Sequence, residues 1–516
     1  MRYTVSWYAL AVVATGLLGI SSHPGSNSLA MAQDSSSASS SSDNGSKGQD
    51  GRGCISDFDS NKDYFGTKSS VDESNLFEIE YHNSYKVLTT KGAGGAKGNT
   101  YVLYMCGAPT PDAAKDADAA FEIPPRDISV SSTSVTAYIE VLGLQDKIKS
   151  LGSAVDITSP CLQKMIGENH ISSIDATNKT AAASQLESVG IAFSNTPDSK
   201  NTVISSEYSD PSILGRVEWV KFFGAFFNAE DKANKVYGQI SDNYNCVTDK
   251  AQKQYNNLRP VVAWTAYAAP SQYNNNTAYY IISGAEYKYN LTRDSGARML
   301  NATTGMIYSQ EEFLDALKEV DVIVDESFEG TTLDDILKSY GVTKDNTDDF
   351  PWAKNKRVFR HDGIQNKASG DGFYESAFVF ADALLEDLIS VSHPEFSKTG
   401  YQRRWLRDIG VGEEVRVLGS QDCEGSSKNP RIDMATKCSD LDLQKTPDNS
   451  TIYDGVEKDN NNDLVASFDD SGKTLVSVLE SKSQGSGSQE GAGSSYHATI
   501  FNIASAVTVV AIAACF

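Results

Sequence analysis

The sequence is poor in histidine and lacks the short spacings that mark a metal site or a common catalytic motif. Six histidines occur in 516 residues, and four of them, His82, His170, His361 and His393, are scattered along the chain. No two cysteines form a C-x-x-C pair, and the glycine-rich stretch 92–98 lacks the Lys-Ser/Thr ending of a phosphate loop. These absences argue against a structural zinc and against an enzyme. We therefore expect no catalytic residue, no metal and no cofactor.

Positive charge and long internal apolar runs are also scarce. The net charge of -23 disfavours nucleic acid and anionic membrane surfaces as partners. Apolar stretches stand instead at the two ends of the chain. The stretch Trp7–Ile20, followed by Ala30-Met31-Ala32, predicts a secretory signal peptide over 1–32. A Gly/Ser/Gln spacer before the apolar stretch 500–516 predicts a cleaved lipid-anchor signal over 496–516, with an uncleaved tail anchor as the alternative.

What the sequence does contain fits a secreted glycoprotein. Outside the C-terminal tail there are six cysteines, an even number that predicts disulfides without specifying their pairing. Acceptor sequons for N-glycosylation occur at Asn44, Asn178, Asn275, Asn290, Asn301 and Asn449, and we expect several of them to be modified and exposed, Asn178, Asn275, Asn290, Asn301 and Asn449 above all.

Composition divides the chain into a folded part and polar ends. Residues 33–53 are rich in Ser, Asp and Gly and predict a disordered leader, and 439–495 are polar and acidic like a stalk. Between them we expect an N-terminal αβ lobe over 54–228, a linking helix over 229–256 and a C-terminal αβ lobe over 257–438.

The folded part alternates strand-like and helix-like patterns. Residues 77–105 predict a small β meander. After Pro124-Pro125, the strand Ile128-Ser-Val130, a polar loop and a helical spacing up to Gly143 form an αβ unit, and similar units follow. A second set begins with the strand Pro260–Trp264. The predicted fold class is therefore α/β, with two αβ lobes in a bilobal substrate-binding-protein architecture.

The segment from Arg216 to Lys235 predicts how the lobes are joined. Its aromatic half has one apolar helical face, and Asn228 then suits the N-cap of a new helix with acids in its first turn. Apolar positions from Ala233 to Ala251 keep a 3.6-residue period for about six turns, which predicts a long helix with one buried stripe. Glu218, Trp219 and Lys221 either line a cleft or form the exposed face of the first helix.

These patterns resemble a known family. The stretch Pro124–Gly143, the long helix, and Phe313–Val324 before Asp325 resemble the helix-linked class of periplasmic binding proteins that capture vitamin B12, haem and ferric siderophores. The likeness covers roughly residues 74–415. The stretch Ser205–Asn228, together with the two terminal signals, is similar to algal cobalamin-acquisition proteins. The resemblance implies a ligand cleft between the lobes; the glycan sites and the stalk depart from the bacterial pattern.

In such a fold the ligand site lies beyond the carboxyl ends of the strands. Aromatic side chains there supply large apolar surfaces, and nearby polar groups orient the ligand. We expect the ligand contacts to come from loops after strands in both lobes: Ser131, Ser132, Thr133, Ser206, Glu207, Tyr208, Trp264, Thr265, Tyr267, Phe373 and Tyr374. Trp264 is expected to be a principal contact; the rival interpretation is a core tryptophan.

Three functions compete at this point. The first is a secreted, membrane-tethered protein that captures cobalamin for uptake, working with an uptake receptor or transporter. The second keeps the fold but binds a ferric siderophore or haem. Such an anionic iron complex favours several Arg or Lys in the cleft. The predicted loops contain none, which favours cobalamin, although Arg293, Arg298 and Arg360 could still reach into the cleft. The third is a glycosylated surface adhesion protein without a small ligand.

Overall fold

The structure is a computed structural model. It describes residues 52–443 except 93–96, 176, 198, 258, 303–304, 328–329, 398–399 and 425–434. The predicted signal peptide, most of the leader, nearly all of the stalk and the predicted anchor signal lie outside the described residues, as does Asn449. None of the described helices combines the length and the apolar character needed to cross a membrane.

The N-terminal lobe contains two sheets. A four-stranded sheet has the order β1-β2-β3-β4, where the predicted meander β1 to β3 gains a parallel edge strand. A five-stranded parallel sheet has the order β7-β6-β5-β8-β9. The strands are β1 Phe77–Tyr81, β2 Tyr85–Thr90, β3 Thr100–Met105, β4 Ala119–Ile123, β5 Ile128–Val130, β6 Ile148–Leu151, β7 Ser172–Ser173, β8 Ile191–Ser194 and β9 Thr202–Ile204. The helices are α1 Thr133–Val141, α2 Pro160–Gly167, α3 Lys179–Glu187 and α4 Ile213–Ala225.

The C-terminal lobe is built on a seven-stranded mixed sheet. Its main path is β13-β11-β10-β14-β15-β17, and β12 pairs with β10. The strands are β10 Val261–Ala268, β11 Tyr279–Ile282, β12 Arg298–Met299, β13 Met306–Ile307, β14 Val322–Asp325, β15 Val358–Arg360 and β17 Arg407–Asp408; β16 Ile364–Asn366 and β18 Arg416–Leu418 form a separate pair. The helices are α6 Glu286–Asp294, α7 Gln310–Ala316, α8 Leu333–Tyr340, α9 Pro351–Lys354, α10 Ala381–Ser392 and α11 Pro394–Ser397.

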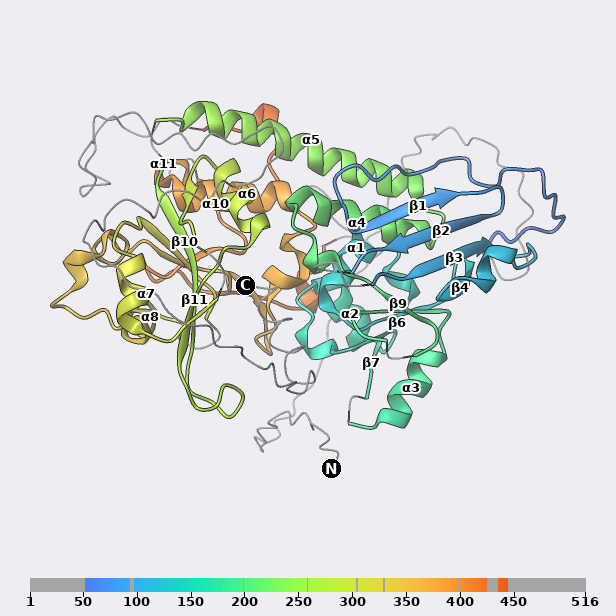
Figure 1. Ribbon diagram of the computed structural model, residues 1–516, viewed down its shortest axis with the longest axis horizontal. Coiled ribbons are helices and arrows are strands. Elements are labelled where there is room, and N and C mark those ends of the chain that lie inside the picture. Colours follow the sequence, from blue (N-terminus) through green and yellow to red (C-terminus); the bar gives the residue numbers. More distant parts are fainter. Residues whose placement is uncertain are drawn as a thin grey trace, which may run out of the picture.

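One long helix joins the lobes. Helix α5 spans Glu230–Gln254 and runs along the top of both lobes (Figure 1). Its buried positions follow the predicted stripe, from Ala233 through Tyr244 to Ala251. The stripe packs against α4 on one side and α10 on the other, so a single apolar core continues from one lobe into the other. The predicted fold class, two αβ lobes joined by a long helix, is confirmed.

The junction between α4 and α5 differs from the prediction in detail. Asn228 is not the N-cap of α5: it has a left-handed backbone with φ 53°, and Ala229 occupies the cap position. The side chain of Asn228 instead accepts a hydrogen bond from the buried Lys86 at 2.9 Å. Asparagine tolerates the left-handed region better than most residues, so it suits a tight turn between two helices.

Helix α4 is buried on all sides. Neither predicted place for Glu218, Trp219 and Lys221 is correct, because all three are buried away from solvent and the residues that line the pocket described below do not include them. The carboxylate of Glu218 accepts hydrogen bonds from the backbone N–H groups of Asp72 and Glu73. It also forms an ion pair with Lys221 at 2.8 Å. An extended N-terminal segment therefore covers the face of α4 that looked exposed.

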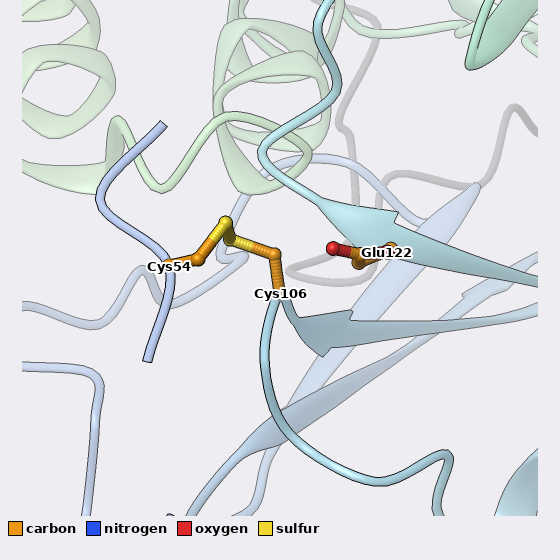
Figure 2. Close-up of side chains that lie close together, drawn as sticks. All are labelled: Cys54, Cys106 and Glu122. Atoms are coloured by element: carbon orange, nitrogen blue, oxygen red, sulfur yellow. A yellow bond between two sulfur atoms is a disulfide. The ribbon is translucent and has the colours of Figure 1, made fainter. Parts of the chain in front are cut away.

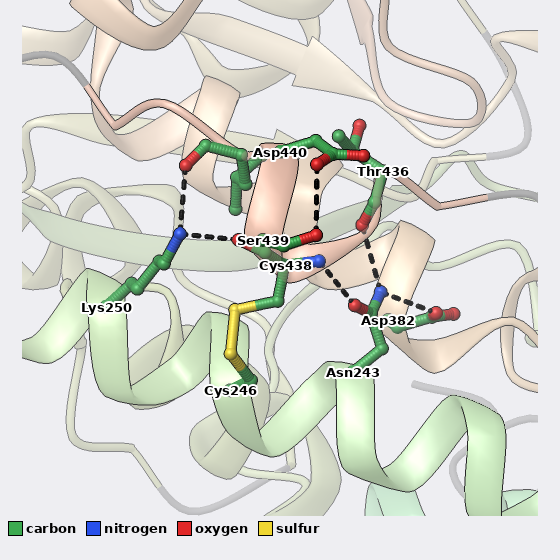
Figure 3. Close-up of a disulfide and its surroundings, with 9 residues drawn as sticks. Asn243, Cys246, Lys250, Asp382, Thr436, Cys438, Ser439 and Asp440 are labelled. Atoms are coloured by element: carbon green, nitrogen blue, oxygen red, sulfur yellow. Dashed lines mark hydrogen bonds between the residues drawn. A yellow bond between two sulfur atoms is a disulfide. The ribbon is translucent and has the colours of Figure 1, made fainter.

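The six cysteines form three disulfides, Cys54–Cys106, Cys161–Cys423 and Cys246–Cys438. Figure 3 shows the last of them, which fastens the segment before the predicted stalk to the middle of α5. Around it, Asn243 accepts from the N–H of Cys438 at 2.8 Å and donates to Asp382 of α10 at 3.0 Å. The last described residues thus lie against the linking helix.

The described sequons lie at or near the surface. Asn178, Asn275 and Asn301 are exposed, and Asn290 is half-buried on α6. Asn178 also caps α3, since its side-chain oxygen accepts from the N–H groups of Thr180 and Ala181.

Candidate functional site

A pocket of about 160 Å³ lies where the two lobes meet. Its N-terminal-lobe wall comes mainly from loops at the carboxyl ends of β5, β8 and β9, where the fold predicts a ligand site. These wall residues are Ser132, Thr133, Ser134, Tyr138, Asn195, Glu207, Tyr208 and Arg216. The parallel strands bring these loops together, although they are spread over more than seventy positions of the sequence.

The opposite wall belongs to the C-terminal lobe. It consists of Tyr287 on α6 and four residues from the π-helical turn after β16 and the stretch that follows it, Tyr374, Glu375, Phe378 and Val379. The π-helix at Phe373–Ala377 widens the turn at this point, and such turns often occur at functional sites. The pocket therefore has a polar wall from one lobe and a mainly aromatic wall from the other.

Arg216 of α4 is the cation of the pocket. Its Nε donates to the carbonyl oxygen of Asp210 at 2.8 Å, which holds the side chain in place. The guanidinium carbon lies 3.8 Å from the ring centroid of Tyr287 and 4.7 Å from that of Phe378. Aromatic faces attract cations at such distances, so the contact also couples the two lobes.

Glu207 is the anion of the same wall. It follows β9 and is buried. Its Oε1 accepts a hydrogen bond from the Ser134 hydroxyl at 2.7 Å, and its Oε2 is buried without a partner among the described residues. Tyr138, which also lines the wall, donates its hydroxyl to the carbonyl oxygen of Arg216 at 2.7 Å.

A second carboxylate of the pocket lining, that of Glu375, joins the two lobes. It accepts hydrogen bonds from the Thr158 hydroxyl at 2.7 Å and from the Ser159 N–H at 3.0 Å, both in the N-terminal lobe. The Ser159 hydroxyl in turn donates to Glu140 of α1 at 2.7 Å. Burial raises the pKa of Glu375 to about 7 and that of Glu140 to about 8, so both carboxyl groups titrate near neutral pH.

Five of the predicted contacts meet at the pocket: Ser132, Thr133, Glu207, Tyr208 and Tyr374. Ser131 and Ser206 are neighbours in the same loops but do not line it. The N–H of Ser131 donates to Phe193 and continues the pairing of β5 and β8. Phe373 is fully buried behind the wall, where it packs against His361 and Phe378.

The structure does not bring the predicted contacts Trp264, Thr265 and Tyr267 to the pocket. Trp264 is 0% exposed, and its indole N–H donates to the Thr292 hydroxyl at 3.1 Å. Thr265 is also buried, against the Tyr340 hydroxyl, and Tyr267 packs on Tyr280. The reason is the length of β10, which continues to Ala268 and pairs with β11 as a hairpin. Trp264 is therefore in the middle of a core strand, which supports the rival interpretation.

Sequence reasoning missed Arg216, Tyr287 and Phe378. Arg216 stands in a helix whose aromatic neighbours indicate packing, and only its charge in a wholly buried helix could have singled it out. Tyr287 and Phe378 are more than seventy positions from Arg216 in the sequence, so no local spacing connects them.

The described residues contain one group whose ligand atoms are close enough to hold a metal, Cys54, Cys106 and Glu122 (Figure 2). The two cysteines are bonded to each other, so neither supplies a thiolate. Glu122 pairs with Arg52 at 3.2 Å. This group is therefore a structural disulfide beside a surface ion pair.

Comparison with known proteins gives distant matches. No protein-family model matches the chain. An uncharacterized lipoprotein of Methanocaldococcus jannaschii is 27% identical over 201 residues, which cover 38% of this chain and 43% of that protein. An uncharacterized protein of the same organism is 30% identical over 77 residues, 15% of this chain and 23% of that protein. The chain thus spans less than half the length of either of these relatives.

The chain is also similar to solved structures of periplasmic and solute-binding proteins. They include a possible iron-binding periplasmic protein of Staphylococcus epidermidis (15% identity, TM-score 0.39, 52% of this chain and 98% of that one). A periplasmic heme-binding protein of Pseudomonas aeruginosa has 14% identity and a TM-score of 0.38, and the match covers 57% of this chain and 99% of that one. A petrobactin-binding protein of Bacillus subtilis has 12% identity and a TM-score of 0.39, and the match covers 59% of this chain and 98% of that one. At these scores the likeness says nothing about the ligand.

Proposed function

We propose that this protein is a solute-binding protein that captures a small organic molecule between its two lobes and holds it for uptake. The observation that carries the proposal is the pocket itself, whose walls come from both lobes and combine aromatic rings with a few fixed polar groups. Such a combination is typical of small-molecule sites.

Cobalamin is the first ligand to test. The stretch Ser205–Asn228 resembles cobalamin-acquisition proteins, and it supplies Glu207, Tyr208 and Arg216 to the pocket. Pockets for drug-sized ligands measure about 300 to 1,000 Å³, whereas this pocket measures about 160 Å³. A molecule as large as cobalamin therefore requires the lobes to move apart, or lies partly outside the pocket.

A ferric siderophore or haem is the second candidate, and Arg216 favours it. Both kinds of ligand carry anionic oxygen atoms, which a guanidinium binds well. The predicted loops contain no Arg or Lys, but the structure adds Arg216 to the pocket from helix α4. The charge argument that favoured cobalamin is therefore weaker than the sequence alone indicated.

The proposal includes a location. Residues 1–32 would direct the chain into the secretory pathway and then be cleaved off, and exchange of 496–516 for a lipid anchor would tether it to a membrane through the stalk. A receptor or transporter would then take the solute from the bound protein.

Calorimetric titration of the purified protein with cyanocobalamin, haemin and a ferric hydroxamate siderophore tests the proposal. We expect saturable binding of one of them. Tyr287→Ala, which removes an aromatic wall of the pocket, should weaken it at least about tenfold. The matched control is Tyr273→Ala, because Tyr273 is 83% exposed. If none of the three solutes binds, or if both variants lose affinity equally, the proposed function is wrong.

A further inference from the structure

Arg216 differs from every other buried cation in the described part of the chain. The buried lysines and arginines other than Arg216 each form an ion pair with a carboxylate: Lys86 with Glu230, Lys221 with Glu218, Lys288 with Glu326, Arg360 with Asp325 and Arg407 with Asp362. Arg216 is only 4% exposed, yet no described carboxylate lies within 4.0 Å of its nitrogen atoms. The buried carboxylate of Asp210 interacts with Arg216 only from a longer distance. A buried charge without a direct ion pair is costly, so the exception calls for an explanation.

The geometry leaves part of the guanidinium available. Its Nε donates to Asp210, and aromatic rings of the other lobe lie close to the group. Its two terminal nitrogens have no acceptor within hydrogen-bond distance among the described residues, and the side chain lines the pocket. Two parallel N–H groups of this kind match the two oxygens of a carboxylate or phosphate.

Glu207 supplies the complementary half of the site. Its Oε2 is buried in the same wall and has no donor among the described residues. A carboxylate oxygen accepts hydrogen bonds only, so the natural partner is an N–H or O–H group. A ligand with an anion alone would meet Arg216 favourably but would leave Glu207 unpaired and close to a like charge.

We propose that the pocket recognises a ligand that carries a carboxylate or phosphate next to an N–H or O–H donor. Nη1 and Nη2 of Arg216 bind the anion, and Glu207 Oε2 accepts from the donor. This inference rests on the proposed function, because it concerns the same pocket, and it narrows the ligand class. Haem carboxylates and the phosphodiester of cobalamin both offer the anion, and the amides of cobalamin also offer donors.

The first test uses simple anions. Thermal unfolding of the full protein is followed in increasing acetate or inorganic phosphate, with chloride at equal ionic strength as reference. For the wild type we expect a saturable rise of the unfolding midpoint of about 2 °C or more with at least one anion. Arg216→Met should lose this rise. Arg298→Met should keep it, because Arg298 is exposed on β12 and likewise donates through Nε to a backbone carbonyl.

The variants keep the test decisive. If Arg216→Met does not fold, Arg216→Lys retains the charge without the planar fork and should show a weaker anion effect than the wild type. Equal midpoint shifts in the wild type and the Arg216 variant, or no shift in the wild type, would overturn the proposal. If Arg216 and Glu207 form an ion pair with each other in solution, the wild type will show no midpoint shift. A response to acetate only indicates a carboxylate ligand, and a response to phosphate only indicates a phosphate ligand.

A second arm separates this inference from the proposed function. Cyanocobalamin carries a phosphodiester-linked nucleotide that dicyanocobinamide lacks. Arg216→Met should therefore weaken the binding of cyanocobalamin at least about tenfold and the binding of dicyanocobinamide much less. Glu207→Gln should lower the affinity for the solute, whereas Glu187→Gln at the exposed end of α3 should leave the affinity unchanged. Anion binding at Arg216 without binding of any organic solute would contradict the proposed function alone. Solute binding that is indifferent to Arg216 and Glu207 would contradict this inference alone.

Discussion

Cys161 and Cys423 are 262 positions apart in the sequence and form a disulfide across the two lobes. Cys161 is on α2 of the N-terminal lobe, and Cys423 follows β18 and the turn Ser420–Asp422, which pack beside it. Gln163 of the same helix also donates to the carbonyl oxygen of Leu418 at 3.3 Å. The bond and the Glu375 contacts therefore join the lobes in addition to the linking helix α5.

Removal of this bond should loosen the lobes. For Cys161→Ser/Cys423→Ser we expect a loss of about 2 to 4 kcal/mol in the free energy of unfolding, the usual range for a structural disulfide. The radius of gyration from small-angle scattering should increase as well. Cys54→Ser/Cys106→Ser is the control, because that bond lies within the N-terminal lobe and should leave the lobe separation unchanged. An equal radius in all three proteins would contradict a cross-lobe restraint.

Trp264→Ala should destabilise the protein without altering the pocket. Its side chain is fully buried and its N–H bonds to Thr292, so the cavity left by truncation should cost about 3 to 5 kcal/mol of unfolding free energy. Denaturant titration measures this loss, and solute affinity is measured at a temperature where the variant is still folded. A variant with normal stability and impaired binding would show that Trp264 contacts the ligand after all.

The two carboxyl groups at the lobe contact should make stability depend on pH. The pKa of Glu140 rises from 4.5 to about 8 and that of Glu375 to about 7, mainly through burial. The folded state thus holds these protons more tightly than the unfolded chain. Their stabilising contribution is complete below pH 4.5 and is lost as the pH rises through 7 and 8.

Glu140→Gln isolates this effect, since glutamine stays neutral at every pH. We expect the variant to match the wild type near pH 5 and to be more stable by on the order of 1 kcal/mol or more near pH 8.5. Thermal unfolding across this pH range measures the difference. Glu187→Gln, at an exposed position, should follow the wild type throughout. A Glu140→Gln variant that is less stable than the wild type at high pH would contradict a raised pKa of Glu140 in the folded state.

The buried pair of Lys86 and Glu230 should be essential to the start of α5. Both side chains are buried, and Lys86 also donates to the carbonyl oxygen of Ala225 at 2.7 Å. Glu230→Gln leaves the lysine without its counter-charge, and we expect it to cost about 3 to 5 kcal/mol of unfolding free energy. Asp112→Asn at the exposed pair with Lys115 should change little. Similar losses in both variants would show that burial is not what makes the pair important.

Much of the fold could be predicted from the sequence because its signals are local. The 3.6-residue stripe from Ala233 to Ala251 is a property of one helix, and it predicts α5 and its buried face. Likewise, polar residues directly after short apolar strands predict a strand end, and parallel strands place those ends together. For this reason Ser132, Thr133, Glu207 and Tyr208 reach the pocket as the pattern indicates.

Only the tertiary structure decided the rest, because it depends on contacts between distant segments. The length of β10 depends on its pairing with β11, and that pairing moves Trp264 from a strand end into the core. The pairing of the six cysteines depends on how the lobes are placed. Arg216 becomes part of a site only because Tyr287 and Phe378 approach it from the other lobe. No periodicity along the chain encodes such an approach, since it results from the packing of both lobes on α4 and α5.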